Sequence, residues 1–462
     1  MVRTAGLTRC RRGDGLIEAG DRPDLRAPAE VVRIARRLQD AGYETWAVGG
    51  AVRDALAGGA PGDWDLTTAA RPQEVQRLFR RTVPVGIEHG TVAVLGDDGH
   101  RYEVTTFRRD VETDGRHAVV RFADRVEEDL ERRDFTINAV AWHPLTHAVR
   151  DPHGGMADLR AGVLRTVGAP AERFREDRLR VLRAFRFAGR FGLRIDPATW
   201  EAAREAAAEL PLLSAERVRE ELMKVMGEVE RPSEALSLYA WSGALAVLYP
   251  ELGACMGFAD KGEDLWEHLM GTAGAISRSR PELRLAGLLH DVGKPVVAPS
   301  GSHEFPGHAA AGAALVHGLL RRLRFSNRMV DGTLHLVAQH TDLPDAAATD
   351  VEVRRWLRRV GREHVRDLLR LRIADSRARA SAGCEAMIVT MWRRAHAALA
   401  ARVPLEIGDL AIGGDSLREL GIPPGPRYGR ILGALLDAVI EDPTMNTRER
   451  LMSRAAGLAD QA

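Results

Sequence analysis

The 462-residue sequence predicts an α+β protein, in which a mixed unit of sheet and helices is followed by a mainly helical remainder. Two observations predict this class. Up to about residue 150, short strand-like apolar segments alternate with short helical patterns. After DPHGG at 151–155, strand signals become rare and long stretches place apolar residues at helical spacing. The chain is about three times as long as a typical domain of ~150 residues, so several modules are expected.

The elements of the first unit are expected in a fixed order. Residues 1–26 lack apolar periodicity and predict a mobile arm. An amphipathic helix is expected at 30–39, then a strand in YETWAVGG at 43–50 that ends in a double-glycine turn. The order continues with a helix at 51–58, a strand at 64–70, a helix at 71–80 and a hairpin at 91–107 whose turn is GDDGH.

Composition indicates an ordinary globular protein, with 45% hydrophobic and 28% charged residues. No apolar run approaches the ~20 residues that span a bilayer, and no signal peptide is recognisable, so no membrane partner is expected. The cysteines Cys10, Cys255 and Cys384 are isolated, which argues against a disulfide framework and favours the cytoplasm. The net charge is only +1, so a nucleic acid would have to bind at local arginine patches.

The first candidate site contains two aspartates, Asp63 and Asp65, which flank Trp64. In a strand, the two-residue period places both carboxylates on one face and the indole on the other. Mg²⁺ binds a few carboxylates together with substrate phosphates, and a pair of such ions can activate a 3′-hydroxyl and stabilise a pyrophosphate leaving group. The alternative is an acidic pair that only solvates a turn, and spacing alone does not decide between the two.

Three neighbouring features strengthen that candidate. Gly49 and Gly50 follow an apolar strand and open a helix, which lets the backbone approach a phosphate closely. Arg53 falls in the first turn of that helix, and Glu103 in the later strand is a third carboxylate. The alternatives are a plain turn for the glycines and an exposed hairpin position for Glu103.

A base-reading pair is the second candidate. In a helix, Asp177 and Arg180 share a face, and Glu176 can pair with Arg180. An aspartate accepts from an exocyclic amine and an arginine donates to a ring nitrogen, which matches cytosine and adenine but not uracil or guanine. Leaving these charges unpaired would cost several kcal/mol, enough to reject UTP and GTP. The alternative is an intrahelical ion pair worth about 0.5 kcal/mol.

The third candidate is a set of histidines around the contiguous pair His290 and Asp291, which closes an apolar helix. Neutral imidazoles and a carboxylate can hold Ni²⁺, Mn²⁺ or Fe²⁺ and lower the pKa of a bound water for attack on a phosphoester. The last ligand is open, because Thr341 separates Asp342 from His340. The alternative is a helical spacer with an idle site. The expected ligands are His268, His290, Asp291, His308, His340 and Asp342.

Five segments together resemble one known family. They are WAVGGAVRDALAG at 46–58, GDWDLTTAARPQEV at 62–75, LERRDFTINAVAW at 130–142, ERFREDRLRVLRAFRFA at 172–188 and ERVREELMKVM at 216–226. Their order and spacing resemble the class II tRNA nucleotidyltransferase and poly(A) polymerase family. The resemblance implies a polymerase-β-like nucleotidyltransferase head and a helical neck. It also implies template-independent addition of C, C and A to tRNA 3′ ends from CTP and ATP with Mg²⁺.

The resemblance also assigns roles to single residues. Asp63, Asp65 and Glu103 are expected to be catalytic, with Asp63 and Asp65 holding Mg²⁺, and Asp177 and Arg180 are expected to select the base. The expected nucleotide-binding residues are Gly49, Gly50, Arg53, Arg132, Arg133, Asp134, Asn138, Glu176, Asp177, Arg180 and Arg183. Residues 108–122 resemble the family's flexible loop, which favours complete CCA addition. The closest alternatives are an A-only adding enzyme and a bacterial poly(A) polymerase.

Residues 268–342 resemble the HD domain of some bacterial members, which acts on phosphates or 2′,3′-cyclic phosphates at RNA ends. A rival of another class is therefore a metal-dependent HD phosphohydrolase whose head only binds RNA. Arg355, Arg358, Arg359 and Arg362 form a basic stripe that we expect to contact a tRNA backbone. The oligomeric state is not fixed by the sequence. The expected domains are the arm at 1–26, the head at 27–147, the neck at 148–262, the HD domain at 263–345 and the tRNA-binding body and tail at 346–462.

Overall fold

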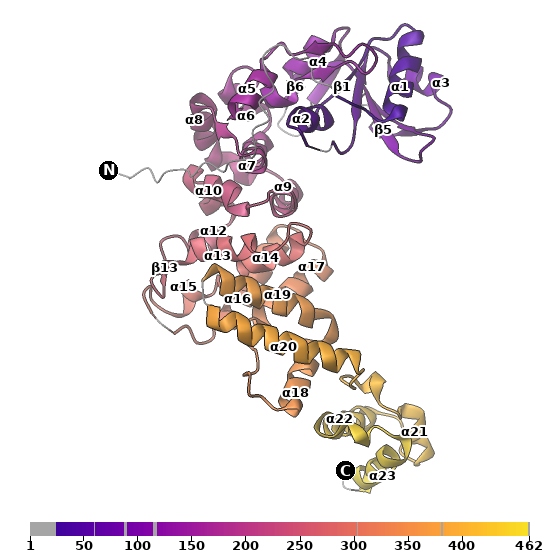
Figure 1. Cartoon of the computed structure of the whole chain (residues 1–462), viewed down its shortest axis with the longest axis vertical. Coiled ribbons are helices and arrows are strands. Elements are labelled where there is room, and N and C mark those ends of the chain that lie inside the picture. The colour runs from indigo at the N-terminus through magenta and orange to yellow at the C-terminus, as the bar shows by residue number, and fades with distance from the viewer. Residues whose placement is uncertain are drawn as a thin grey trace. The chain divides into compact units, whose positions relative to one another are not determined.

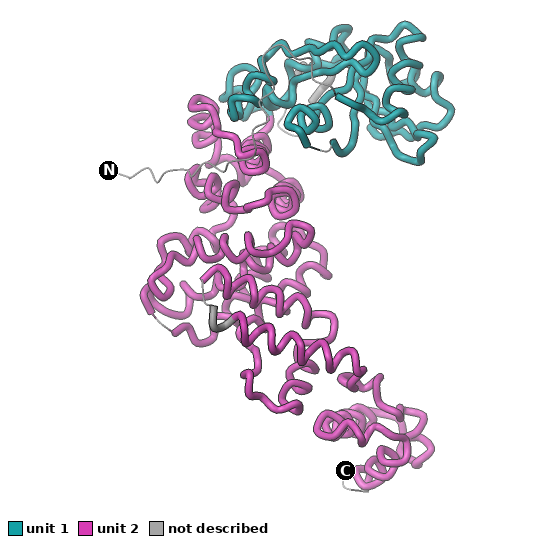
Figure 2. The backbone as a smooth tube through the Cα atoms, viewed as in Figure 1, with its two compact units in different colours: residues 1–176 teal, residues 177–462 magenta. Residues whose placement is uncertain are grey.

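The computed structural model describes residues 25–59, 61–86, 90–113, 118–302, 304–379 and 382–460. The expected arm, up to residue 24, and residues 114–117 of the expected flexible loop lie outside this range. The chain divides into two compact units, residues 1–176 and 177–462 (Figure 2). Each unit is described by itself, with the element labels of Figure 1.

Unit 1 is built on a seven-stranded mixed sheet with the strand order β3-β4-β5-β2-β1-β8-β9. Strands β2 and β5 are parallel, and the other neighbours are antiparallel. The hairpin expected at 91–107 is confirmed as β4 and β5, since Leu95 pairs with Arg101 across the turn. The strands are β1 Thr45–Val48, β2 Asp65–Thr68, β3 Thr82–Pro84, β4 Thr91–Leu95, β5 Arg101–Thr106, β8 Ala141–Trp142 and β9 Val149–Arg150.

The expected first helix is confirmed as α1, Ala29–Asp40, and it buries Val31, Ile34 and Leu38 in one apolar core with sheet residues such as Leu66 and Val104. This i, i+3, i+7 stripe is why the segment folds as a helix against the sheet. The other helices of unit 1 are α2 Gly50–Leu56, α3 Pro72–Leu78, α4 Val126–Glu131, η2 Thr136–Asn138, α5 Gly155–Ala161 and α6 Pro170–Glu176. The remaining strands are β6 Arg108–Thr113 and β7 Ala118–Phe122, which form a separate hairpin, and β10 Val163–Leu164.

Unit 2 is almost entirely helical in its described residues, which confirms the α+β class and the change after residue 150. Its first helices are α7 Leu179–Phe191, α8 Pro197–Ala206, η3 Ala207–Leu212, α9 Ala215–Glu228, α10 Pro232–Ser242, α11 Ala244–Leu248 and α12 Pro250–Gly253. The middle helices are α13 Leu265–Gly274, α14 Pro281–Leu289, α15 Lys294–Val297, α16 His308–Arg322 and α17 Asn327–Gln339. The last are α18 Asp350–Val360, α19 Arg362–Ala378, α20 Ala382–Ala400, η4 Ile407–Asp409, α21 Gly414–Glu419, α22 Pro426–Glu441, η5 Pro443–Met445 and α23 Arg448–Asp460. The short strands are β11 Arg194–Ile195, β12 Ala259–Asp260 and β13 Glu263–Asp264.

A buried ion pair holds the first helices of unit 2 together. Arg186 on α7 is 4% exposed and donates from Nε to Glu221 Oε2 on α9 at 2.7 Å. Glu228, the last residue of α9, accepts from Arg186 and Arg190. Elsewhere, none of the helices in the described ranges is both long and apolar enough to cross a membrane.

Candidate functional site

The three expected catalytic carboxylates come together at one end of β2. Trp64 is buried with its ring centroid 5.7 Å from that of Trp142, whereas Asp63 is exposed and Asp65 is half-buried. The parallel pairing of Leu66 with Val104 places Asp65 and Glu103, each one residue earlier, beside each other. Burial, Glu103 and Asp63 raise the pKa of Asp65 to about 6, against the opposing effect of Arg133. The arrangement therefore concentrates negative charge, which a divalent cation would relieve.

The glycine turn before α2 borders these carboxylates. Gly49 has a φ of 74°, a backbone conformation that favours glycine. A Cβ atom at Gly49 would lie 3.3 Å from Arg133 Nη1 and 3.7 Å from Asp65 Oδ2. The absent side chain thus leaves room for an arginine and a carboxylate that were both expected in the site.

A hydrogen-bonded chain runs behind the turn. Arg53 is 5% exposed, and its Nη1 donates to Asn138 Oδ1 at 2.7 Å, while its Nε donates to Asp54. Asn138 Nδ2 donates to Asp134 Oδ1 at 2.8 Å. Three residues assigned to nucleotide binding by resemblance therefore share one polar network in the head.

Asp129 is a supporting residue that the sequence reasoning missed. It is fully buried and pairs with Arg132 at 2.9 Å and with Arg133 at 3.2 Å. Burial alone would raise the pKa of Asp129, but the two guanidinium groups hold it below its ordinary value. The sequence carries a signal for this pairing. Asp129 precedes Arg132 by three residues and Arg133 by four, which in a helix places all three side chains on one face.

The expected continuous helix through the base-reading pair is wrong. Helix α6 ends at Glu176 and α7 begins at Leu179, so Asp177 lies between them. The physical reason is the aspartate itself, since its Oδ1 accepts from the backbone N–H of Leu179 at 3.0 Å and competes with a continuing helix. Arg180 falls in the first turn of α7.

The partners of this segment also differ from expectation. Asp177 Oδ2 accepts from Arg217 Nη2 at 2.7 Å, a residue on α9 that the sequence reasoning did not single out. Glu176 accepts from Arg173 at 3.0 Å. The guanidinium of Arg183 lies over the ring of Phe187, with 5.1 Å from Cζ to the ring centroid.

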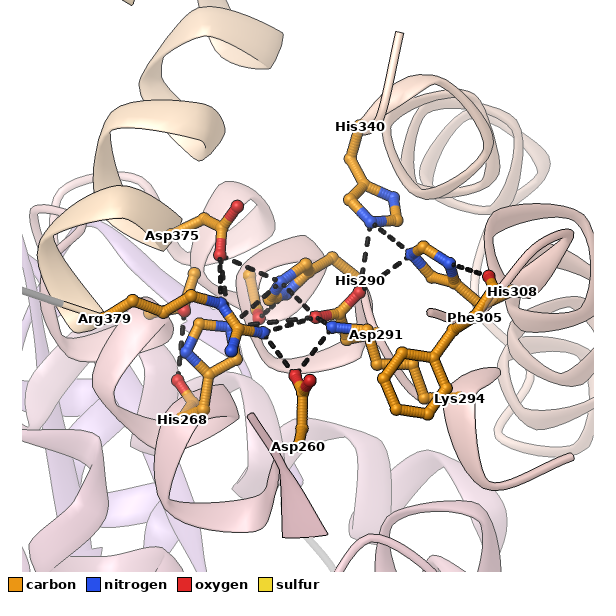
Figure 3. A network of polar contacts seen from close by, with 12 residues as sticks. Asp260, His268, His290, Asp291, Lys294, Phe305, His308, His340, Asp375 and Arg379 are labelled. Atoms are coloured by element: carbon orange, nitrogen blue, oxygen red, sulfur yellow. Dashed lines mark hydrogen bonds and ion pairs between the residues drawn. The ribbon is translucent and has the colours of Figure 1, made fainter. Parts of the chain in front are cut away.

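The histidines expected to bind metal converge in unit 2 (Figure 3). His268 comes from α13, His290 and Asp291 follow α14, His308 begins α16 and His340 follows α17. His268 Nε2 lies 3.4 Å from His290 Nε2, and His308 Nε2 lies 3.1 Å from His340 Nε2. All of these side chains are buried or nearly so.

The carboxylate that completes the cluster is Asp375 on α19, not Asp342. Asp375 Oδ1 lies 3.2 Å from His268 Nε2 and 3.7 Å from His290 Nε2. Asp342 instead pairs with Arg359 at 2.7 Å and is partly exposed. It diverges because it lies past the end of α17, two residues after His340. The missed signal is that Asp375 falls four residues after the buried Leu371, on the apolar stripe of α19.

The cluster fits a divalent cation in its donor atoms. The Nδ1 atoms of His290, His308 and His340 lie 2.6–2.8 Å from the carbonyl oxygens of Gly287, Phe305 and Val337. A neutral imidazole that donates through Nδ1 carries its lone pair on Nε2, and here each Nε2 faces the other ligands. Two three-residue groups have ligand atoms within 4.8 Å of one another, His268 with His290 and Asp375, and His290 with Asp291 and His340.

The histidines and carboxylates of the cluster shift one another's pKa values. Burial alone would raise the pKa of Asp291, but His290, His308 and His340 hold it well below its ordinary value. Burial would lower the pKa of His290, whereas Asp291 and Asp375 raise it to about 9. A metal ion bound to Nε2 would therefore have to displace a proton from His290.

Two basic side chains flank the same carboxylates and were also missed. Lys294 Nζ contacts Asp291 Oδ2 and lies 2.9 Å from Asp260 Oδ2. Arg379 Nη2 lies 2.7 Å from Asp260 Oδ2 and 3.1 Å from Asp291 Oδ2. Asp260 is thus a shared counter-charge for both (Figure 3).

The arginine stripe expected to contact tRNA pairs with acidic residues of the chain. Arg355 pairs with Glu441 and Arg358 with Asp437, both on α22, and Arg362 pairs with Asp409 at 2.5 Å. These pairs connect α18 and α19 to the last part of the chain. Contact of this stripe with tRNA stays a prediction.

Comparison with known proteins now identifies the family. The chain is 34% identical to the CCA-adding enzyme of Geobacillus kaustophilus over 428 residues, which cover 91% of this chain and 95% of that protein. The chain belongs to the CCA-adding enzyme family. It is also 31% identical to the CCA-adding enzyme of Limosilactobacillus fermentum, over 92% of this chain and 96% of that protein.

Three regions of this family member match domain models. Residues 45–165 match the poly A polymerase head domain, and 192–256 match a probable RNA and SrmB-binding site of polymerase A. Residues 261–380 match the HD domain, a range that includes Asp375 and extends past the boundary expected at 345. Nucleotidyltransferase and HD domains generally use divalent metals, which agrees with the presence of candidate metal ligands in both clusters.

Solved structures agree with this assignment. The CCA-adding enzyme of Bacillus stearothermophilus in complex with CTP superposes with a TM-score of 0.69 at 30% identity, over 94% of this chain and 97% of that one. The Thermotoga maritima CCA-adding enzyme complexed with tRNA has a TM-score of 0.57 at 20% identity and supports the fold alone.

Proposed function

We propose that this chain adds C, C and A to the 3′ ends of tRNA, with CTP and ATP as substrates. The observation that carries the proposal is the similarity to a CCA-adding enzyme over 91% of this chain and 95% of the relative, at 34% identity. The gathering of Asp63, Asp65 and Glu103 beside the Gly49 turn supports it.

The isolated cysteines, among them the free thiol of buried Cys255, support a cytoplasmic location.

The head residues have separate tasks in this proposal. Asp63 and Asp65, with Glu103, would hold Mg²⁺, which when bound activates the 3′-hydroxyl of the tRNA and stabilises the pyrophosphate. Arg53 is held by Asp54 and Asn138, so its guanidinium is already oriented before a triphosphate arrives. Arg133, next to Gly49 and Asp65, offsets part of the negative charge around the carboxylates.

The neck residues would select the base. Asp177 uses one lone pair on each oxygen for Leu179 and Arg217, and a carboxylate oxygen has a second lone pair for an exocyclic amine. Arg180 would donate to the ring nitrogen, which cytosine and adenine present unprotonated. The chain would thus reject UTP and GTP without a nucleic-acid template.

Incorporation of each labelled nucleotide onto three tRNA transcripts, ending in the discriminator base, in CC and in CCA, tests the function. We expect ordered C, C, A addition on the first, A alone on the second, and no addition on the third. Addition of A only, and only to the CC end, would instead indicate an A-adding enzyme. Extension past CCA would indicate a poly(A) polymerase.

A second function is supported by the histidine cluster, and we propose it as an accessory activity. His268, His290, Asp291 and Asp375 would hold a divalent transition metal such as Ni²⁺, Mn²⁺ or Fe²⁺, for hydrolysis of phosphoesters at RNA ends. Opening of the 2′,3′-cyclic phosphate at an RNA end to a terminal phosphomonoester, which an added phosphatase can then remove, tests it. The activity should survive Asp63→Asn and be lost in His290→Gln, and persistence in His290→Gln would exclude this site.

A further inference from the structure

We infer that a hollow beside Trp241, the Trp241 hollow, binds an arginine side chain that a partner protein presents. The hollow measures about 450 Å³, which is within the range of ligand pockets, and it is lined by α8 and the end of α10 in unit 2 (Figure 1). It shares no residue with the HD cluster or with the base-selecting pair. Its lining residues are Glu201, Arg204, Glu205, Ala240, Trp241, Ser242 and Gly243.

The surface around this hollow exposes large apolar side chains. Trp241 is 65% exposed, although its neighbours Tyr239 and Ser242 on α10 are buried. Leu212 at the end of η3 is 72% exposed, and Val247 on α11 is 41% exposed. Helix η3 packs against both α8 and α11, so these side chains belong to one part of the neck. Exposed apolar side chains that gather on one surface, a tryptophan above all, are typical of a protein interface.

The side-chain charges of the hollow favour a cation. Glu201 and Glu205 on α8 are both exposed and both line the hollow. Arg204 pairs with Glu201 at 3.0 Å, whereas no residue in the described part of the chain forms an ion pair with Glu205. Two carboxylates therefore face one guanidinium, and the lining keeps one net negative charge.

The backbone adds to this negative potential. The residues from Ala240 to Gly243 are the last of α10 and its cap, where Gly243 takes a φ of 85°. The C-terminal end of a helix carries a partial negative charge on its carbonyl groups, which favours a cation near the last turn. The same charges repel a phosphate, so the hollow does not match an RNA backbone.

A guanidinium group fits these features better than an ammonium group does. It is planar and weakly hydrated, so it can stack on the indole of Trp241 and donate from its edge to a carboxylate such as Glu205. The exposed Leu212 and Val247 would pack against apolar side chains next to that arginine, which a protein segment supplies and a small free cation does not. The occupant is therefore a protein segment with an arginine beside apolar residues.

Binding of a defined peptide to the full chain tests the inference. The probe is a fluorescein-labelled heptapeptide, Gly-Leu-Arg-Gly-Arg-Leu-Gly, and fluorescence anisotropy measures its binding. A second peptide carries citrulline in place of both arginines, which removes the charge and keeps the shape. We expect the arginine peptide to bind at least about tenfold more tightly, because only a cation is attracted by the indole and the carboxylates. Equal binding of the two peptides, or no binding of either up to about 1 mM, would overturn the inference.

Variants of the lining assign the binding to this hollow. Trp241→Ala should weaken binding of the arginine peptide by more than about tenfold, and Glu205→Gln by about threefold. Arg204→Ala should strengthen it by about threefold, because this change removes the cation that competes for Glu201. Glu220→Gln, the same charge change at an exposed position of α9, is the matched control and should leave binding unchanged. A Trp241→Ala protein that melts at the wild-type temperature and binds the peptide like wild type would contradict the site.

Two other occupants predict different results. The family model that matches residues 192–256 names RNA among its ligands, and an RNA oligonucleotide would lose affinity in both Trp241→Ala and Arg204→Ala. We expect CMP and AMP incorporation into tRNA by Trp241→Ala to stay within about twofold of wild type, and a larger loss would point to RNA. A second copy of the chain would give a dimer in analytical ultracentrifugation that Trp241→Ala dissociates. Either result would overturn the assignment to an arginine of a partner protein.

Discussion

In the head, the candidate carboxylates come from β5 and from β2 with the residues just before it, whereas the HD ligands come from five helical segments between His268 and Asp375. The head carboxylates Asp63 and Glu103 are exposed, and only Asp65 is half-buried. In the HD cluster, by contrast, His290 is completely buried and Asp291 is 2% exposed. The head site thus lies exposed at two central strands of the sheet, and the HD site is a closed core of polar groups.

The difference teaches how each site depends on its surroundings. A site on paired strands is positioned by strand register, which the two-residue period largely fixes. A site between helices depends on how the helices pack, which involves residues far apart in the sequence. We therefore expect substitutions in the HD cluster to be strongly specific to single positions, and the first prediction below examines this.

Asp375 and Asp342 are the two candidates for the last metal ligand, and substituting each in turn should give the largest difference in metal affinity. We expect Asp375→Asn to weaken divalent metal binding in the HD domain by more than about 100-fold, beyond the 10–100-fold typical of residues that only support a ligand. Asp342→Asn should change it less than twofold, because Asp342 pairs with Arg359 outside the cluster. Calorimetric titration with Mn²⁺ in the Asp63→Asn and Asp65→Asn background measures both. Equal effects of the two variants would refute the placement of Asp375.

The buried ion pair of Arg186 and Glu221 should give the next largest effect, on the free energy of unfolding. Glu221→Gln leaves the buried Arg186 with only the partly exposed Glu228 as counter-charge and should lower the free energy of unfolding by about 3 kcal/mol. Glu220→Gln, at an exposed neighbouring position on α9, is the control. Urea titration monitored by circular dichroism measures the difference, and a loss under about 1 kcal/mol would show that the pair is not stabilising.

The pH dependence of that pair follows from its pKa. Burial would raise the pKa of Glu221, but Arg186 lowers it below its ordinary 4.5. A carboxyl group whose pKa is lowered on folding stabilises the protein above the unfolded pKa, and this contribution is lost as the pH falls through the folded pKa. The gap between wild type and Glu221→Gln should therefore be constant from pH 7 to about 5 and shrink below about 4.5. A gap that widens on acidification would contradict the assigned sign.

Gly49 and Gly42 in the head both have a positive φ, but only Gly49 borders the site. Comparing their alanine variants therefore distinguishes an effect of backbone strain from an effect on the site. Both Gly49→Ala and Gly42→Ala should destabilise the chain by about 1–3 kcal/mol. Only Gly49→Ala should also lower kcat/KM for nucleotide addition, by about tenfold, because its Cβ would press on Arg133 near Asp65. A Cβ at Gly42 meets nothing within 4 Å. Equal kcat/KM for the two variants would argue against a role for the Gly49 turn.

The arginine stripe should give the smallest effect on stability. Arg358→Ala removes an exposed ion pair with Asp437 and should change the free energy of unfolding by less than about 0.5 kcal/mol. Thermal unfolding of this variant beside wild type measures it. A tRNA dissociation constant raised by more than tenfold in the same variant would show that the arginine contacts RNA despite its acidic partner.

The sequence allowed the head to be predicted in more detail than the HD cluster. The strand with Asp65, the hairpin of β4 and β5 and the helix α1 follow from local periodicity, and the structure confirms them. The break at Asp177 was missed, because an aspartate can cap a helix or continue it and the choice depends on its hydrogen bonds. Asp375 was missed for a different reason. Its own segment indicates only that Asp375 lies on the apolar stripe of α19, whereas its proximity to His268 arises from packing of α19 against α13.

The most direct test of the central claim, that the head carries nucleotide addition independently of the HD cluster, is a reciprocal assay of two variants. Asp65→Asn and Asp291→Asn are each compared with wild type for CMP and AMP incorporation into tRNA that ends at the discriminator base. We expect Asp65→Asn to lose at least about 1,000-fold in rate, equivalent to about 4 kcal/mol, and Asp291→Asn to stay within about threefold. Loss of incorporation in a folded Asp291→Asn protein, with activity retained in Asp65→Asn, would contradict the account.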